Sequence, residues 1–470
     1  MVLYTAKDAF ADQDPRRNRM TPPAHLAGWV DADGEALRRA YAYLEARHKA
    51  PCSLGHTPLM LQRLPVLGVA NDINYVVRSF ALAVHHGAKL LLLPPREARP
   101  EWMGLVADRD VDSSAWHWFD GLPGASLSSI FVPSSCQQLL QQPAHRDRLR
   151  MLDRLTRNRS VIRNVSAVSL QLGLGARVYD HENTWSGRLI LAHGVKLSIV
   201  PPQFRKHGVL WWWQILTTYL VRVRGVLAER VSNHPSVARL LRRLAVATDR
   251  PPSEQAAWLA ESRAALRWAA SAGAGNSSAV SNGNGGGEEL GWFPDVAFHA
   301  ALHVRQGDAC GPKARKNQAE LRKCVRSFAQ GLAPLLAHGV VPNGGRLFLA
   351  TDSQLIADEA AEAAKTLPFG VYWLRLNRAK YDDGTWIELA SAAAGSQARI
   401  LEEALLDVLL LSRARFIAGS MYGNVPRLAL QMRPTTPGDK RRLTYLTTDG
   451  RDWCTRVSCI KNNTKTGIFW

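Results

Sequence analysis

The feature that most constrains the fold is a regular alternation of apolar runs and helical segments in the second half of the chain. The runs DVAFHAALHVR, RLFLATD, GVYWLRL and RFIAGS have the composition of buried strands. The segments between them carry apolar residues at helical spacing, around 317–337, at 354–365, at 396–414 and from Val425 onward. Strands that alternate with helices predict an α/β domain with a doubly wound sheet.

A similar unit is predicted in the first hundred residues. In LPVLGVANDINYVVRSFALAVHHGAKLLLLPP we expect a strand at 64–69, the polar loop NDIN, a helix over 75–86 and the strand KLLLLPP. Parallel strands need such a helix as a crossover. Because α/β sheets bind ligands beyond the carboxyl ends of their strands, Asn71 and Asn74 in the loop are candidate ligand residues.

Length and composition predict two domains, because 470 residues with 46% hydrophobic content exceed one ordinary core. We expect an N-terminal accessory arm at 1–59, a first α/β domain at 60–207 and a second domain at 208–470. The runs SIFVP, VSLQL, RLILA and VKLSIVPP are assigned to the first domain. The Gly/Ser/Asn-rich stretch at 271–289 cannot bury enough apolar surface to fold, which predicts a disordered insert.

The second domain is expected to open with a mostly helical region at 208–270. Its beginning, GVLWWWQILTTYLVRV, is the longest apolar stretch of the chain, but it is too short to span a bilayer and contains Gln214 and Arg222. It therefore predicts a buried helix and no transmembrane segment. The three tryptophans are interpreted as core or domain-interface residues, with sugar stacking as the alternative.

The net charge of +19, from 59 basic and 40 acidic side chains, indicates an anionic partner. A nucleic acid, a membrane surface and a phosphorylated small molecule all fit this charge. The basic residues are scattered in short runs that acids and apolar residues interrupt, which argues against nucleic acid.

Cysteine content and N-glycosylation sequons favour the secretory pathway. The six cysteines permit disulfides: Cys454 and Cys459 could close a small loop, and Cys310 and Cys324 flank a basic segment. No CxxC pair occurs, which argues against a zinc site. The chain has four sequons but no hydrophobic signal segment at its amino end.

Three strands of the second domain end in polar groups, in LHVRQGD, FLATD and FIAGSMYGN. In a parallel sheet these carboxyl ends lie side by side, so their polar residues should converge on one crevice. The converging residues are Arg305, Asp308, Thr351, Asp352, Ser420 and Asn424.

Each group at this crevice has two interpretations. Arg305 could bind a diphosphate through its paired donors, or could form an ion pair with Asp308 or Asp352. Neither GxGxxG nor GxxxxGK[ST] is present, so the chain lacks the NAD and P-loop motifs. Asp407 lies within an apolar helical pattern, where a carboxylate needs a hydrogen-bond network or a ligand. His303 is either a satisfied core histidine or a ligand contact.

Four motifs, taken in order, resemble the catalytic region of α1,6-fucosyltransferases of N-glycans and nodulation factors: LWWWQILTTYL, LHVRQGDAC, LFLATDS and EALLDVLLLSRARFIAGSMYGNVPRLALQM. The segment ANDINYVVRSFALAVHHGAKLLLL is similar to that family's first β-loop-α-β unit. The resemblance implies a GT-B-like pair of Rossmann-like domains, with acceptor side 60–207 and nucleotide-sugar side 208–470. It also implies GDP-fucose as donor, inversion at the anomeric carbon, no metal or other cofactor, a glycan or glycoprotein acceptor, and a Golgi or secretory location.

The resemblance also assigns residue roles. Arg305 matches the arginine that binds the β-phosphate, His303 the histidine beside guanine, and Asp407 the aspartate that reads the N1 and N2 edge of guanine. Asp352 matches the first acid of an ATDD element, and Ser420, Tyr422, Gly423 and Asn424 match a loop around the nucleotide. Asp308 and Asp352 are the candidates for the general base.

The chain departs from the family pattern on the acceptor side. Ala309 and Lys313 stand where the family has a lysine and a glutamate, Ser353 replaces the second acid of ATDD, and Tyr422 and Gly423 replace paired serines. Two alternatives therefore stay open. One is a protein O-fucosyltransferase or another sugar-nucleotide transferase, and the other is a non-catalytic binding protein on a transferase scaffold.

Overall fold

The computed structural model describes residues 33–52, 56–63, 68–93, 129–137, 178–180, 199–223, 225–247, 254, 298–306, 310, 324–325, 327–378, 397–421, 423–432 and 444–448. They form two compact units that meet in the sequence between Arg222 and Val223. We call them the N-terminal and the C-terminal unit. The predicted insert at 271–289 and the Cys454 and Cys459 pair lie outside the described residues.

The C-terminal unit is built on a sheet of five parallel strands. They are β4 (Ala300–Val304), β5 (Arg346–Thr351), β6 (Gly370–Trp373), β7 (Phe416–Gly419) and β8 (Thr444–Thr447). Their order in the sheet is β6-β5-β4-β7-β8, and each neighbouring pair is parallel. The predicted α/β class with a parallel sheet is confirmed; β8 was not predicted.

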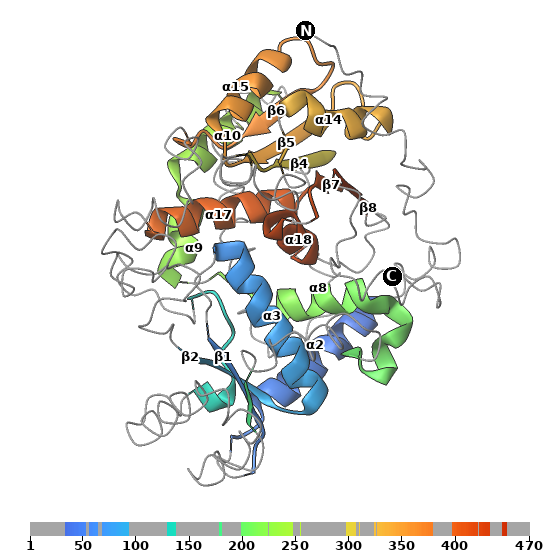
Figure 1. Cartoon of the computed structure of the whole chain (residues 1–470), viewed down its shortest axis with the longest axis vertical. Coiled ribbons are helices and arrows are strands. Elements are labelled where there is room, and N and C mark those ends of the chain that lie inside the picture. Colours follow the sequence, from blue (N-terminus) through green and yellow to red (C-terminus); the bar gives the residue numbers. More distant parts are fainter. Residues whose placement is uncertain are drawn as a thin grey trace. The chain divides into compact units, whose positions relative to one another are not determined.

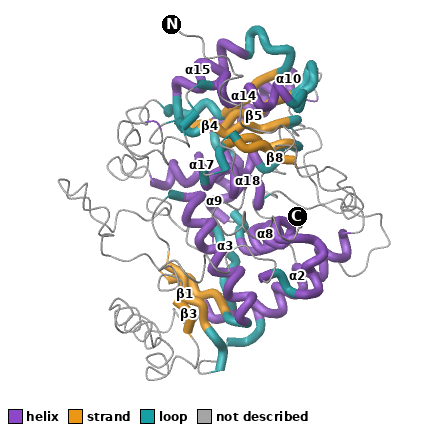
Figure 2. Tube along the Cα trace, turned by 45° about the vertical axis from the view of Figure 1, so that its right-hand side comes forward, coloured by secondary structure: helices purple, strands orange, loops and turns teal. Residues whose placement is uncertain are grey.

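Helices cover both faces of this sheet. Figures 1 and 2 show α14 (Phe328–Ala337) and α15 (Gln354–Ala363) on one face, and α17 (Gln397–Leu411) and α18 (Asn424–Gln431) on the other. The Ser327 hydroxyl accepts the Gln330 N–H and so begins α14 at Phe328. Cys324 and Val325, which are described, are not helical, so the predicted helix from about residue 317 is wrong at these two positions.

The alternation of side chains along the strands explains the layers. Leu302 and Val304 of β4 belong to the apolar cluster that also contains Phe328 of α14 and Ile356 of α15. Successive side chains of a strand point to opposite faces. His303 therefore points to the face of the sheet that α17 covers.

Helix α9 (Gly225–Ser232) and helix α10 (Pro235–Ala247) confirm the helical prediction after residue 208. Side chains of α10 bind carbonyl groups of edge strand β6 and of the segment after it. Arg243 Nη2 donates to the Val371 carbonyl oxygen at 3.2 Å, and Ser236 Oγ donates to that of Arg375 at 2.8 Å. Arg239 Nη2 also donates to the Arg375 carbonyl, at 3.2 Å.

The N-terminal unit contains a smaller parallel sheet. Its order is β2-β1-β3, with β1 (Leu59–Arg63), β2 (Lys89–Leu93) and β3 (Val178–Asp180). Helix α3 (Val69–His86) connects β1 to β2, as predicted, and packs on both strands.

The predicted loop at Asn71 and Asn74 is wrong. Strand β1 lies five residues earlier than the predicted start, at Leu59, and α3 begins at Val69, so both asparagines are helical. Asn74 is buried, and its Nδ2 donates to the Ala70 carbonyl at 2.8 Å. The helix extends through NDIN because Ile73 is buried in continuation of the apolar face that follows it.

Two of the short runs assigned to the first domain do not form strands where they are described. SIFVP contains a 3-10 turn and an isolated antiparallel bridge between Phe131 and Val221. The described end of VKLSIVPP leads into the 3-10 helix η8 (Pro202–His207). VSLQL and RLILA lie outside the described residues.

Helix α8 (Gly208–Leu220) confirms the predicted buried helix, and it packs on α3 and on α2 (Asp33–Lys49). Trp211, Trp212 and Trp213 are all buried, and Trp212 stacks on Phe204 with ring centroids 5.4 Å apart. The three rings are therefore core residues, and enclosed rings offer no face for stacking a sugar. None of the described helices combines the length and the hydropathy that crossing a bilayer requires.

Disulfide and hydrogen bonds hold the end of α2. Cys52 is bonded to Cys136. His48 Nε2 lies 2.9 Å from the Val132 carbonyl oxygen, and Lys49 Nζ donates to that of Pro133 at 2.7 Å. The end of α2 is thus held to the rest of the N-terminal unit.

Candidate functional site

The candidate site lies at the carboxyl ends of three adjacent strands of the C-terminal unit. Strand β4 is central: Val304 pairs with Thr351 of β5, and His303 pairs with Gly419 of β7. The predicted adjacency of the three strand ends is therefore confirmed. Because β4 and β7 are neighbours without being consecutive, the order of the strands reverses between them, and such switch points are where open α/β sheets bind ligands.

His303 is buried at this switch point and is held uncharged. Its pKa falls from 6.5 to about 3, chiefly because burial disfavours the imidazolium and secondly because Arg305 and Arg378 are nearby. Its Nδ1 is buried without a hydrogen-bond partner among the described residues. His303 is thus a neutral imidazole at any physiological pH.

The chain after β4 is fixed by the chain after β5. The Gln306 N–H donates to Asp352 Oδ1 at 2.8 Å, and Ser353 Oγ donates to Gln306 Oε1 at 2.5 Å. Ser353 also caps the amino end of α15. Asp352 therefore holds the backbone next to Arg305, and Ser353 holds the Gln306 side chain.

A disulfide closes the loop that follows Arg305. Cys310 is bonded to Cys324, fourteen residues later. On either side of it, the Cys310 N–H donates to the Gln306 carbonyl at 2.7 Å and the Val325 N–H donates to the Arg305 carbonyl at 3.3 Å. The disulfide therefore keeps Val325, at the far end of the loop, close to the Arg305 backbone.

Asp407 of α17 forms a loose ion pair with Arg378. Arg378 Nη2 lies 3.5 Å from Asp407 Oδ2, and the exposed fractions of the two side chains are 4% and 16%. Asp407 Oδ1 is buried without a hydrogen-bond partner among the described residues. Burial, with smaller contributions from Glu403 and Asp352, raises the pKa of Asp407 to about 7 against the lowering effect of Arg378.

Arg378 also connects this pair to the sheet, because its Nη1 donates to the Thr351 carbonyl at the end of β5. Sequence reasoning missed Arg378: it follows β6 by five residues, and no local pattern indicates that it returns to α17. The only indication in the sequence was Asp407, because a carboxylate in an apolar helix requires a partner.

The turn between β7 and α18 is tightly built. A Cβ at Gly419 would lie 3.2 Å from the Cβ atoms of His303 and Pro426, so a side chain there would crowd β4. Gly423 donates its N–H to the Ser420 carbonyl at 2.9 Å. The buried Arg427, also missed from sequence, donates from Nη2 to Asn424 Oδ1 at 2.6 Å.

Four other predicted site residues are not among the described residues of the strand-end site. Asp308 and Tyr422 lie outside the described residues. Asn71 and Asn74 belong to the N-terminal unit, whereas all the described residues of the strand-end site belong to the C-terminal unit.

The described site combines a neutral imidazole, three guanidinium groups and two carboxyl groups. Guanidinium groups bind phosphate oxygens, and a buried carboxylate accepts paired N–H donors such as those of a nucleobase. The described residues contain no group of three or more His, Cys, Asp or Glu side chains placed to hold a metal ion. No protein-family model matches the chain, and no curated protein matches it significantly.

Proposed function

We propose that the chain is an inverting glycosyltransferase that transfers fucose from GDP-fucose to a glycan. The observation that carries the proposal is the placement of His303, Arg305 and Asp407 around the switch point of a parallel sheet. In this assignment Asp407 Oδ1, which has no partner among the described residues, takes up the guanine edge. Arg305 binds the diphosphate.

In the proposed reaction a hydroxyl oxygen of the acceptor attacks C1 of fucose from the face opposite GDP. The bond between C1 and the β-phosphate oxygen breaks, and the hydroxyl proton passes to a carboxylate. Arg305 stabilises the negative charge that develops on the departing GDP. Asp308 is the preferred base, because Asp352 already accepts the Gln306 N–H.

Calorimetric titration of the full chain with GDP, UDP and ADP tests the nucleotide assignment. We expect a clear preference for GDP and a loss of about 10- to 100-fold in GDP affinity for Arg305→Ala, as for the removal of a charge-assisted hydrogen bond. Arg415→Ala is the matched control, because the exposed Arg415 directly precedes β7 at the other end of the sheet. Equal affinity for the three nucleotides, or unchanged GDP binding in Arg305→Ala, contradicts the proposal.

The engagement of Asp352 and Ser353 with Gln306 favours a second candidate, a GDP-fucose-binding protein without transferase activity. Release of fucose from the donor, to an acceptor or to water, separates the two. An acceptor panel of free glycans and folded small domains then distinguishes glycan transfer from protein O-fucosylation. The two disulfides support an oxidising compartment such as the Golgi as the place of action.

A further inference from the structure

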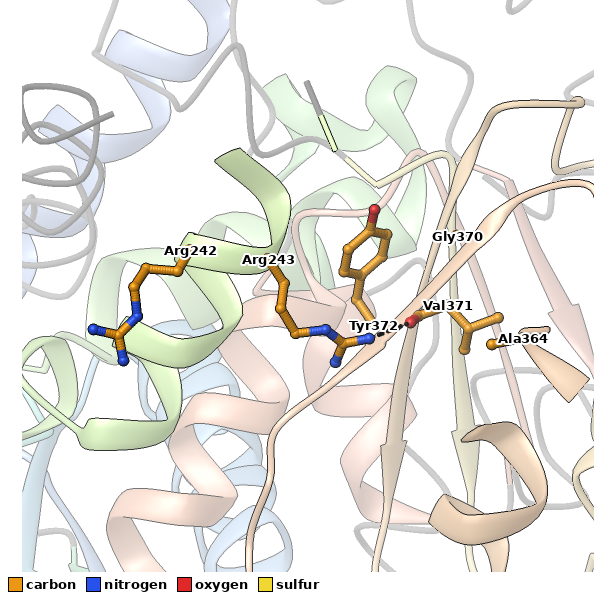
Figure 3. Close-up of a pocket in the computed structure, with 6 residues that line it drawn as sticks. All are labelled: Arg242, Arg243, Ala364, Gly370, Val371 and Tyr372. Carbon is orange, nitrogen blue, oxygen red and sulfur yellow. Dashed lines mark hydrogen bonds between the residues drawn. The ribbon is translucent and has the colours of Figure 1, made fainter. Parts of the chain in front are cut away.

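A pocket lies in the C-terminal unit at the amino end of β6. It has a volume of about 450 Å³. Figure 3 shows its lining: two arginines from α10, three consecutive residues of β6, and the residue that follows α15. These are Arg242, Arg243, Gly370, Val371, Tyr372 and Ala364. Because Gly370 begins its strand whereas His303 stands near the end of its own, the pocket is distinct from the nucleotide site.

The pocket is positively charged without compensation from its own wall. None of its lining residues is acidic. Burial lowers the pKa of Arg243, the nearby Arg375 lowers it further, and only Tyr372 acts in the opposite direction. Because burial and a neighbouring cation both disfavour the charged form of Arg243, a bound anion would be stabilised there.

Arg243 forms a fixed part of this wall. Its guanidinium lies 4.7 Å from the centroid of the Trp373 ring and 5.5 Å from that of Tyr372, and its Nη2 donates to the Val371 carbonyl. The position of Arg243 is therefore explained by its hydrogen bond to the edge strand, and no ligand is needed to account for it. A rigid charge of this kind nevertheless contributes to binding without an ordering cost.

Arg242 has no such structural explanation. It is exposed, it lines the pocket, and it makes no hydrogen bond or ion pair with the described residues. Its guanidinium is thus an accessible cation at the outer edge of the pocket, and Figure 3 shows it pointing away from Arg243.

We propose that this pocket binds a ligand that carries a phosphate or sulfate ester. Arg242 contacts the oxyanion, because a guanidinium matches the geometry of tetrahedral oxygen acceptors, and Arg243 adds its field. The apolar side chains of Val371 and Ala364 contact the body of the ligand. The pocket is open to solvent, so it would hold one end of such a ligand rather than enclose it.

Calorimetric titration of the full chain at about physiological ionic strength, roughly 150 mM salt, uses three probes: inorganic phosphate, a hexose 6-phosphate and a sulfated disaccharide. Saturating GDP is present throughout, so that the strand-end site is occupied. We expect the hexose phosphate or the sulfated disaccharide to bind more tightly than inorganic phosphate. We expect Arg242→Ala to weaken that binding at least about tenfold, with an unchanged melting temperature.

Arg415→Ala is the control for a general loss of one positive charge. The preferred probe identifies the source of the oxyanion as a phosphorylated or a sulfated molecule. Absence of binding by all three probes, undiminished binding in Arg242→Ala, or an equal loss in Arg415→Ala overturns the proposal. Because Arg242 is outside the nucleotide site, GDP affinity is expected to be the same in Arg242→Ala as in the wild type.

Discussion

Asp407 and His303 show how one buried site shifts two ionisable groups in opposite ways. Burial favours the neutral form of each, so it raises the pKa of the carboxyl to about 7 and lowers that of the imidazole to about 3. For Asp407, the stabilising contribution is fully present below the ordinary pKa of 3.8 and is lost as the pH rises through about 7. For His303, the contribution is present above 6.5 and is lost as the pH falls towards 3.

Asp407→Asn should therefore gain stability relative to the wild type as the pH rises. The amide cannot ionise, so the variant avoids the cost of a buried charge between pH 5 and pH 8. Because the pKa rises from 3.8 to about 7, part of the effect is already present at pH 5, and the gain between pH 5 and pH 8 is at most about 3 kcal/mol. The measurement is the difference in urea midpoint between variant and wild type at the two pH values.

Asp407→Glu, which keeps a titratable carboxyl, is the matched control for this experiment. Arg378 stabilises only the ionised form of Asp407, so the loss of this ion pair opposes the gain as the pH rises, and the pKa of about 7 already includes that opposing effect. The slope of the stability difference with pH therefore reports the titration. A difference between Asp407→Asn and wild type that is the same at pH 5 and pH 8 contradicts the inferred pKa.

Elements with strong apolar patterns were predicted well from the sequence, and the exceptions have physical causes. Strands β4, β5, β6 and β7 were predicted because each is a short apolar run between helical segments. The start of α3 was missed because the Asn and Asp residues of NDIN favour loops locally, yet the buried Ile73 continues the helix. Strand β8 was missed because TYLT is four residues long and gains its stability from pairing with β7.

The candidate site shows the same division. The polar residues at the ends of β4, β5 and β7 could be predicted because strand ends of a parallel sheet meet at one edge. The contacts of Arg378 and Arg427 depend on side chains that return from other elements. Periodicity carries no information about such long-range pairs.

The disulfide after β4 should support the binding of GDP. In the double variant Cys310→Ser/Cys324→Ser the covalent closure of the loop is lost, and with it the restraint that keeps the Val325 N–H on the Arg305 carbonyl. We expect GDP affinity to fall on the order of tenfold and the C-terminal unit to lose about 3 kcal/mol of stability. Calorimetry with GDP and thermal unfolding measure the two effects. Wild-type GDP affinity in the folded double variant would contradict a role of the disulfide in placing Arg305.

At the scale of the whole molecule, the two units allow each disulfide to be tested separately. Cys52–Cys136 joins positions 84 residues apart in the N-terminal unit, and closure of a loop of this length is worth about 4.5 kcal/mol. Cys52→Ser/Cys136→Ser should lower the unfolding temperature of the N-terminal unit and leave GDP affinity unchanged, because all the described residues of the proposed nucleotide site belong to the C-terminal unit.

Together the two double variants form a crossed experiment. Differential scanning calorimetry should show a different transition shifted in each variant, and only Cys310→Ser/Cys324→Ser should weaken GDP binding. Loss of GDP affinity on removal of Cys52–Cys136 would show that nucleotide binding depends on the N-terminal unit.

The polar side chains of α10 have a consequence for the solubility of the protein. An exposed strand edge is a template onto which a strand of another molecule can add, and such addition leads to fibrillar aggregates. At β6, Arg243 occupies the Val371 carbonyl, and Ser236 and Arg239 occupy the Arg375 carbonyl that an incoming strand would need. Helix α10 therefore blocks the addition of a further strand at these carbonyl groups, and with it amyloid-type growth from this edge of the sheet.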